Sequence, residues 1–307
     1  MDLQPKFRTF HQTINLGRYD AEATLREKRD RVLSTLRQNC KYKFEPFNQG
    51  SYEMGTGIKP VAGDYDIDVG IVINLDEPAR FNPVTIKGYV HEAVIGHTKN
   101  VRWKEPCITV QYQQGGEPVY HVDLAVYGKD KSGRLHLARG KENAGPEARS
   151  WELADPKGLT STIGSRWADE DAAQFRRVVQ YLKRWKDVHF SPQGNAAPVG
   201  IALTVLANKH FSPSKSGFPV KYDELAATRN VVSGILGGFQ DQITATGRAP
   251  RLVAQAPVAP HTDTLAGMTN QQMTELKSRV DKLKGWLDEA ARTGSTAPLR
   301  QVSQLAL

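Results

Sequence analysis

Two aspartates separated by one residue, Asp66 and Asp68, lie within the strongly apolar segment Tyr65–Asn74. The alternation of this segment predicts a β-strand, on which residues two apart project from the same face. Two carboxylates held side by side repel each other unless a cation lies between them. The pair therefore indicates a metal site, although ordinary aspartates on a solvent-facing strand edge would produce the same pattern.

The segment Asn48–Tyr52 precedes this pair by one loop and has the sequence Asn-Gln-Gly-Ser-Tyr. It follows an expected short strand and is predicted to open a helical turn. Backbone N–H groups at such a turn, together with the Ser51 hydroxyl, form a donor cradle for phosphate, and Gly50 permits close approach of the backbone. A glycine–serine pair is usually only a turn, but here it would bring a bound triphosphate within reach of a metal on the aspartates.

A third carboxylate, Asp123, lies in the segment His121–Val126, whose apolar residues predict a core strand. An unpaired carboxylate in such a strand is costly, so Asp123 is expected either to pair with an arginine or to bind a metal. Three acidic residues on neighbouring strands suit a two-metal site. In that arrangement Asp123 would serve the ion that activates the attacking hydroxyl and would accept its proton, while the second ion would bind the β- and γ-phosphates.

The elements that must position these residues change in character halfway along the chain. In the first half, the patterns predict helices at 20–38 and 84–96, strands at 42–47, 65–74, 106–113 and 119–127, and a loop at 128–164 with one short strand at 135–137. In the second half, they predict helices at 171–190, 199–208 and 269–292 and an extended linker at 248–260. We therefore expect an α+β fold in which a catalytic lobe (1–165) with an N-terminal helix faces a helical lobe (166–307) that completes a nucleotide cleft.

The helix expected at 171–190 is amphipathic, with an apolar stripe that includes Val179, Leu182 and Trp185. The opposite side is predicted to be a mainly solvated basic face, formed by Arg176, Gln180, Lys183, Arg184 and Asp187.

Composition sets broader bounds on the class of protein. The 307 residues carry a formal net charge of +8, which attracts polyanions without choosing among nucleic acid, anionic membranes and phosphate-bearing substrates. The only cysteines, Cys40 and Cys107, are too few for a disulfide scaffold and fit a reducing cytosol. No apolar stretch is long enough to cross a bilayer, and no secretory signal is expected at the N-terminus. The histidines His91, His97, His121 and His136 show no metal-ligand spacing and are expected to be structural.

Taken together, the Gly50-Ser51 pair, the Asp66-x-Asp68 pair and Asp123 on a later strand resemble the pattern of the DNA polymerase β nucleotidyltransferase superfamily. The fuller strings 49–56 and 64–70 are similar to those of the CD-NTases, the bacterial relatives of cyclic GMP–AMP synthase that act in CBASS antiphage defence. The resemblance extends from about Gln49 to Leu206. It implies a polymerase β-type lobe with a central mixed sheet, and Asp66, Asp68 and Asp123 as the catalytic residues and ligands of two Mg²⁺ ions, with Mn²⁺ as an alternative metal.

The same resemblance implies that Gln49, Gly50, Ser51 and Lys183 bind the substrate. Lys183 would contact the triphosphate with its ammonium and have no packing role, so its replacement by alanine should leave the melting temperature unchanged, with Arg184 as a tolerant control. The sequence departs from the family at Pro198-Val199, where a serine commonly follows the proline and meets the phosphates.

The function implied by the resemblance is a cytoplasmic enzyme that joins nucleoside triphosphates into a cyclic di- or trinucleotide messenger and releases pyrophosphate. Its substrates would be ATP, GTP or both, with pyrimidine nucleotides as further candidates. A CBASS regulatory protein is an expected partner, whereas neither a membrane nor nucleic acid is required. Two alternatives stay open: a template-independent nucleotidyltransferase acting on an RNA end or a small molecule, and a non-enzymatic basic module that binds nucleic acid.

Overall fold

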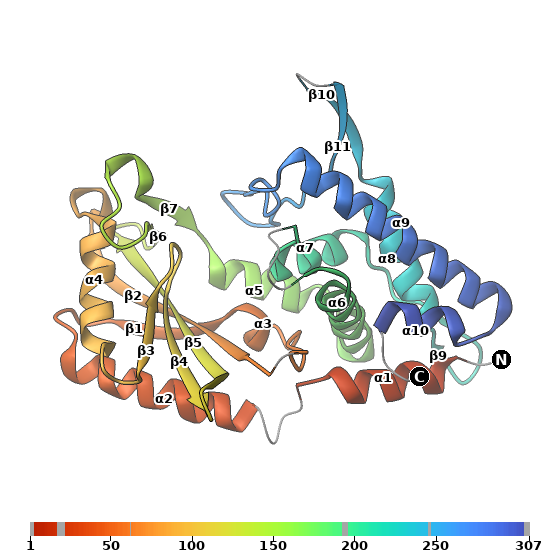
Figure 1. Cartoon of the computed structure of the whole chain (residues 1–307), viewed down its shortest axis with the longest axis horizontal. Helices are drawn as coiled ribbons and strands as arrows, with labels where there is room; N and C mark the ends of the chain where they lie inside the picture. Colours follow the sequence, from red (N-terminus) through yellow and green to blue (C-terminus); the bar gives the residue numbers. More distant parts are fainter. Residues whose placement is uncertain (1–2, 17–21, 62, 192–195, 245–246, 304–307) are drawn as a thin grey trace.

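The computed structural model describes residues 3–16, 22–61, 63–191, 196–244 and 247–303. Within these residues, a lobe built on a mixed β-sheet lies beside a lobe built of helices, and helix α5 (Pro156–Ser165) runs between them (Figure 1). The α+β fold predicted from the sequence is therefore confirmed. Within the described residues, none of the helices combines the length and apolarity needed to cross a lipid bilayer.

The central sheet of the first lobe has the strand order β1-β2-β5-β4-β3, and β6 and β7 extend it from β5. Strands β2 and β5 pair in parallel, whereas the other neighbours pair antiparallel. The bounds are β1 Glu45–Gln49, β2 Tyr65–Asp76, β3 Asn100–Trp103, β4 Ile108–Gln114, β5 Glu117–Asp130, β6 Leu135–Arg139 and β7 Ser150–Ala154.

Helices α2 (Glu22–Asn39) and α4 (Pro83–Val94) cover one face of this sheet. The apolar residues of β2 at positions 67, 69, 71 and 73 alternate onto that face and are fully buried there. The alternate residues, Asp66, Asp68 and Gly70, must therefore project from the opposite face. On that face the Phe47 ring lies where a Cβ at Gly70 would be, which leaves room only for glycine. The predicted start of α2 at residues 20 and 21 falls outside the described residues.

The second lobe has its own apolar core, formed mainly by α6 (Asp169–His189), α7 (Gly200–His210), α8 (Glu224–Gly237) and α9 (Asn270–Thr293). Helix α1 (Gln4–Ile14) also packs into this core, where the rings of Phe7 and Phe10 contact Tyr181. Both ends of the described chain therefore lie on the helical lobe (Figure 1). The division of the chain at residues 165 and 166 stays a prediction.

The remaining elements are α3 Gly50–Glu53, α10 Ala297–Ser303, β8 Lys215–Ser216, β9 Lys221–Tyr222, β10 Gln240–Thr244, β11 Gly247–Arg251, and short 3-10 turns at Pro78–Arg80 and Pro146–Ala148.

Three segments differ from the sequence predictions. Helix α1 was not expected, and the predicted loop at 128–164 contains β7 and α5 in addition to β6. A local signal for α5 was present, because Asp155 caps the helix by accepting from the Gly158 N–H and Pro156 occupies its first turn. The predicted linker at 248–260 begins as strand β11, and Pro250 is tolerated because β11 pairs only with β10.

The helix predicted at 269–292 is confirmed as α9. Thr269 and Gln272 form the predicted capping box, in which each side chain bonds the backbone of the other residue. Gly294 ends the helix in the left-handed conformation, with φ of 63°.

Candidate active site

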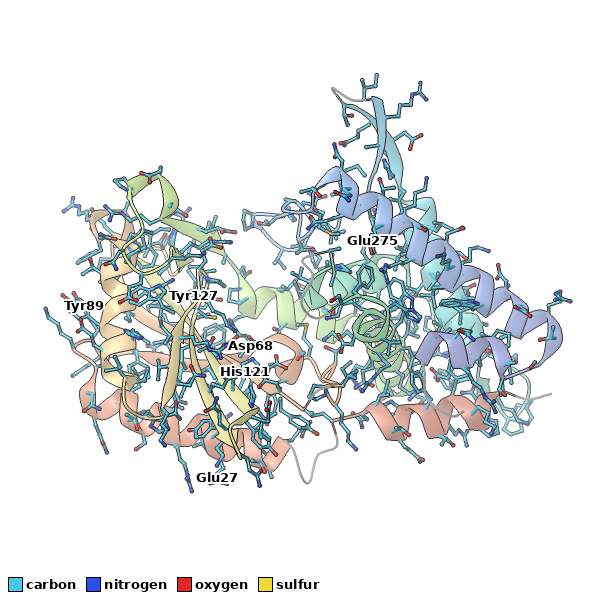
Figure 2. All side chains as sticks on the ribbon, viewed as in Figure 1. Glu27, Asp68, Tyr89, His121, Tyr127 and Glu275 are labelled. Atoms are coloured by element: carbon cyan, nitrogen blue, oxygen red, sulfur yellow. The ribbon has the colours of Figure 1, made fainter. Side chains whose placement is uncertain are left out.

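The predicted carboxylates meet on the face of the sheet that is turned away from α2 and α4. In the parallel register of β2 and β5, Asp68 lies opposite Asp123 and Asp66 lies opposite His121. Burial, together with the negative charges of Asp66 and Asp123, raises the pKa of Asp68 from 3.8 to about 7. Figure 2 places Asp68 and His121 on the side of the catalytic lobe that faces the helical lobe. This edge of the sheet is therefore a site of concentrated negative charge that a cation would stabilise.

Asp123 already has two hydrogen-bond partners. The Thr109 hydroxyl donates to Oδ1, and the Lys104 ammonium lies 3.3 Å from Oδ2. Lys104 thus takes the place of the arginine that the sequence offered as the alternative partner of this carboxylate. Sequence analysis did not identify Lys104, because it precedes β4 in a turn and no local pattern links it to β5.

His121 belongs to the site, although the sequence suggested only a structural role. Its Nδ1 atom lies 2.9 Å from Asp64 Oδ1, and its Nε2 atom lies 3.9 Å from Asp123 Oδ2. A signal for this position was available, because residues 121 and 123 are two apart on one strand and must share a face. The other histidines considered in the sequence lie elsewhere; His97, for example, bonds Thr35 and Tyr112.

A divalent cation fits the chemistry of this donor set. Hard cations prefer carboxylate oxygens, and a cation would offset the burial and the neighbouring negative charges that raise the pKa of Asp68. Among the described residues, however, no three acidic, histidine or cysteine side chains already stand in a metal-binding arrangement. To complete a ligand set, the Asp123 side chain would have to exchange its contacts with Lys104 and Thr109 for the metal. The assignment of Asp66, Asp68 and Asp123 as metal ligands therefore stays a prediction.

The predicted phosphate turn is formed by α3, directly after β1. Gly50 has φ of +67°, and a Cβ built there would lie 2.0 Å from Asp68 Oδ2, so only glycine lets the turn and this carboxylate stand so close. Gln49, the N-cap of α3, makes no side-chain capping bond. Its Oε1 instead accepts from the Tyr127 hydroxyl at 2.9 Å, which anchors Gln49 to β5 and leaves the first N–H groups of the turn without a side-chain cap.

Lys183 corrects one of the sequence predictions. Its side chain was expected to be solvated, but the residue is only 9% exposed. The ammonium donates to the Thr56 carbonyl at 3.1 Å and to the Thr56 hydroxyl at 3.2 Å. Burial lowers the pKa of Lys183 to about 8, and the charges of Asp66 and Asp68 oppose that shift. Lys183 therefore packs as a structural residue and also lines the space in front of the aspartates.

Three of the five residues of the expected solvated face of α6 are buried between the lobes, whereas Arg176 and Asp187 are half-buried. Gln180 donates to the Gly57 carbonyl at 3.0 Å, and Arg184 donates to the Lys59 carbonyl at 2.5 Å. Helical periodicity distinguishes polar from apolar faces, but it does not reveal that a polar face will meet the polar backbone of another segment. The segment 55–59, between α3 and β2, covers these buried residues of α6. We call the contact between α6 and this segment the α6 seam.

The family serine that is absent from the sequence would lie at the start of α7. Val199 is the N-cap of α7, makes no side-chain cap, and is 52% exposed. The next residues, Gly200, Ile201 and Thr204, line the same space as the aspartates. The first backbone N–H groups of α7 therefore have no side-chain cap, because valine has no hydroxyl that could accept from them.

These walls enclose a cleft of about 400 Å³ between the lobes. Its strand wall carries Asp64, Asp66 and Asp68, and its α6 wall carries Lys183, Lys186 and Asp187. Gly50 and Ser51 form one side and α7 the other. Asp123 lies behind Asp68 on β5, in register with it. Carboxylates and Lys183 therefore line the same cleft from opposite sides.

Comparison with known proteins agrees with this geometry. Residues 44–127 match the family model described as cyclic GMP–AMP synthase DncV-like, nucleotidyltransferase domain. The chain is also 26% identical over 216 residues to a cyclic GMP–AMP synthase of Escherichia albertii. That alignment covers 66% of this chain and 46% of the relative, so the chain spans less than half of the relative's length. The region that matches the family model, residues 44–127, includes the phosphate turn and all three aspartates.

Solved structures resemble the whole described chain. The CD-NTase CdnG of Bradyrhizobium diazoefficiens, solved with GTP, superposes with a TM-score of 0.75 at 15% identity and covers 99% of this chain and 96% of its own. CdnC of E. coli MS115-1, solved with ATP, has a TM-score of 0.67 at 15% identity, with 99% and 98% covered. CdnC has also been solved in complex with HORMA-deltaN. Together with the family match, these structures confirm the resemblance inferred from the sequence.

Proposed function

We propose that this chain, whose residues 44–127 form a DncV-like nucleotidyltransferase domain, joins nucleoside triphosphates into a cyclic di- or trinucleotide and releases pyrophosphate. One observation carries the proposal. Asp68 lies in register with Asp123 of β5 and directly against the glycine of the phosphate turn. Asp66 and Asp68 line the same cleft as Lys183. A basic nucleic-acid-binding module has no use for this cluster, because the aspartates would repel phosphate.

In the proposed reaction, a ribose hydroxyl oxygen of one nucleotide bonds to the α-phosphorus of another, and the bond from that phosphorus to pyrophosphate breaks. Asp123 accepts the hydroxyl proton on a carboxylate oxygen. Asp66, Asp68 and Asp123 would hold divalent cations, which we propose to be two Mg²⁺ ions, with Mn²⁺ as an alternative. When bound, such ions activate the attacking hydroxyl and neutralise the leaving pyrophosphate.

The remaining residues position the donor nucleotide. The backbone N–H groups of the Gly50–Ser51 turn and the Ser51 hydroxyl would bind phosphate oxygens next to Asp68. Gln49, anchored by Tyr127, sets the start of that turn. Lys183 would neutralise the far end of the triphosphate from the opposite wall of the cleft. GTP and ATP are bound by the similar proteins CdnG and CdnC, so we propose purine nucleoside triphosphates as the first substrates to test.

A role in CBASS antiphage signalling follows from the same proposal. The HORMA complex of CdnC makes a regulatory protein a reasonable expectation for this chain as well.

Incubation with radiolabelled nucleoside triphosphates and Mg²⁺, one at a time and mixed, tests the proposed activity. We expect a product that resists phosphatase and whose mass equals a cyclic di- or trinucleotide. A product that appears only when an RNA or small-molecule acceptor is added would instead establish the terminal-transferase alternative. The variant with both Asp66→Asn and Asp68→Asn is the matched control, because it keeps the size of both side chains.

A further inference from the structure

Thr56 lies between the phosphate turn and the α6 wall and is fully buried. Its backbone N–H donates to the Ser51 carbonyl at 2.9 Å, so it closes the turn that carries the predicted phosphate donors. Its carbonyl and hydroxyl both accept from the Lys183 ammonium, at 3.1 and 3.2 Å. Thr56 therefore contacts both the phosphate turn and the Lys183 ammonium that faces this turn.

The side chain of Lys183 has few other ways to keep its position. Its stem runs beside the start of α7, where a Cβ built at Gly200 would lie 3.6 Å from Lys183 Cε. A lysine is a flexible point charge that binds phosphate without a preferred geometry of its own. Without a partner for its ammonium, the side chain would be drawn toward Asp66 and Asp68, whose charges already act on it. Those carboxylates are the groups that a metal must reach.

We propose that Thr56 is a positioning residue, which holds the Lys183 ammonium at the cleft wall, away from Asp66 and Asp68 and ready to receive the triphosphate. A substitution at position 56 can remove the hydroxyl, whereas the backbone carbonyl that accepts from Lys183 is present in every residue type. This inference rests on the proposed function, since it assigns Lys183 to the phosphates of the donor nucleotide.

Thr56→Val tests the inference because it keeps the shape of the side chain and removes the hydroxyl acceptor. Since a hydrogen bond to a charged group is lost, we expect the Kd for a non-hydrolysable nucleoside triphosphate with Mg²⁺ to rise roughly tenfold. KM should rise by a similar factor, whereas kcat should change much less, because the metal-binding carboxylates are untouched. Thr56→Ser should restore most of the affinity, and Thr56→Ala serves if the valine variant does not fold.

A double-mutant cycle separates positioning from general damage. In the Lys183→Ala background, Thr56→Val should produce no further loss of affinity, because the residue through which Thr56 acts is gone. Thr228→Val is the matched control: Thr228 is a buried threonine in α8 whose hydroxyl donates to the Glu224 carbonyl at 2.7 Å. It should lose stability without losing nucleotide affinity.

Three results would overturn the inference. These are wild-type affinity in folded Thr56→Val and Thr56→Ala, failure of Thr56→Ser to rescue, or additive losses in the cycle. If the wild-type protein itself binds no nucleoside triphosphate with Mg²⁺, the proposed function fails, and the inference fails with it. The two kinds of failure are therefore distinguishable from the wild-type titration alone.

Discussion

The two walls of the cleft are built in different ways. The strand wall presents carboxylates close together, and burial, with the negative charges of Asp66 and Asp123 added to it, raises the pKa of Asp68. On the opposite side, α6 presents Lys183 in the cleft and Arg184 beside it, and both charged groups already donate to backbone carbonyls of the facing lobe. The first arrangement costs free energy of folding until a cation arrives, whereas in the second each charge has hydrogen-bond partners across the interlobe contact.

This difference shows that residues of one site need not respond alike to mutation. Removing charge from the strand wall should abolish chemistry while leaving the fold unharmed. Removing the charge of Lys183 should damage the fold as well as the binding, because the buried acceptors of Thr56 lose their partner.

The largest effect is expected on the strand wall. Asp66→Asn combined with Asp68→Asn should reduce product formation below detection, because the amides are poor ligands for a hard cation. The melting temperature of the metal-free variant should equal or exceed that of the wild type, because a repulsive pair is removed. Radiolabelled product assays and calorimetric melting in EDTA measure the two effects. A much lower melting temperature would show instead that the pair is structural.

The next largest effect is expected at the junction of the strand wall and the phosphate turn. Gly50→Ala places a methyl group where Asp68 Oδ2 now lies, so either the turn or the carboxylate must move. We expect nucleotide affinity in the presence of Mg²⁺, measured by calorimetric titration, to fall severalfold or more. Gly63→Ala is the control, because Gly63 also has a positive φ, of +84°, but apart from its chain neighbours no atom of the described residues lies within 4 Å of the added methyl group. Equal nucleotide affinity in the two variants would show that the close approach of Gly50 to Asp68 does not matter for binding.

On the α6 wall, Lys183→Ala and Arg184→Ala should separate binding from stability. Each variant removes a donor to a backbone carbonyl, buried at Thr56 and part-buried at Lys59, and should lower the free energy of unfolding by about 1–3 kcal/mol. Only Lys183→Ala should weaken nucleotide binding, because Lys183 lines the cleft and Arg184 bonds Lys59 outside it. Chemical denaturation and nucleotide titration are the two measurements. Unchanged stability of Lys183→Ala would show that its seam contact contributes nothing.

The strand wall also predicts a pH dependence. Because the pKa of Asp68 is about 7 in the folded protein and near 3.8 otherwise, the native state keeps a proton that the unfolded chain has lost between these values. The free energy of unfolding in EDTA should therefore fall as pH rises from about 4 to 7 and then level off, by about 1–2 kcal/mol after solvent screening. Denaturation of the wild type and of Asp68→Asn at pH 5 and pH 8 tests this. A similar pH dependence in the variant would assign the effect to other groups.

The smallest effect is expected at the start of α7. Val199→Ser supplies the missing N-cap hydroxyl and should raise the free energy of unfolding by about 1 kcal/mol. Val199→Ala, which adds no hydroxyl, is the matched control in the same denaturation experiment. A serine variant no more stable than the alanine variant would mean that the start of α7 gains nothing from a cap.

Much of the molecule follows from local pattern. The period of two in Tyr65–Asn74 places Asp66 and Asp68 on one face before any partner strand is known, because side chains of a strand alternate. The capping box at Thr269 and Gln272 predicts the start of α9 for an equally local reason. The α+β architecture follows from how such elements succeed one another along the chain.

Other features depend on contacts between distant segments. Periodicity identified one polar side of α6, but its burial depends on the segment 55–59, more than a hundred residues earlier in the chain. Helix α1 packs on Tyr181 for the same kind of reason. Lys104 meets Asp123 only because β4 pairs with β5, and His121 meets Asp64 only because β2 pairs with β5.

The local sequence was thus sufficient to place Asp66 and Asp68 on one face of a strand and Asp123 on a later strand, because a short-range period controls which face a side chain occupies. The tertiary structure decided whether the charged groups of α6, Lys183 and Arg184, are solvated or buried. That outcome depends on which backbone carbonyls the fold brings within hydrogen-bonding distance, and neither Lys183 nor Thr56 carries a local signal of the other.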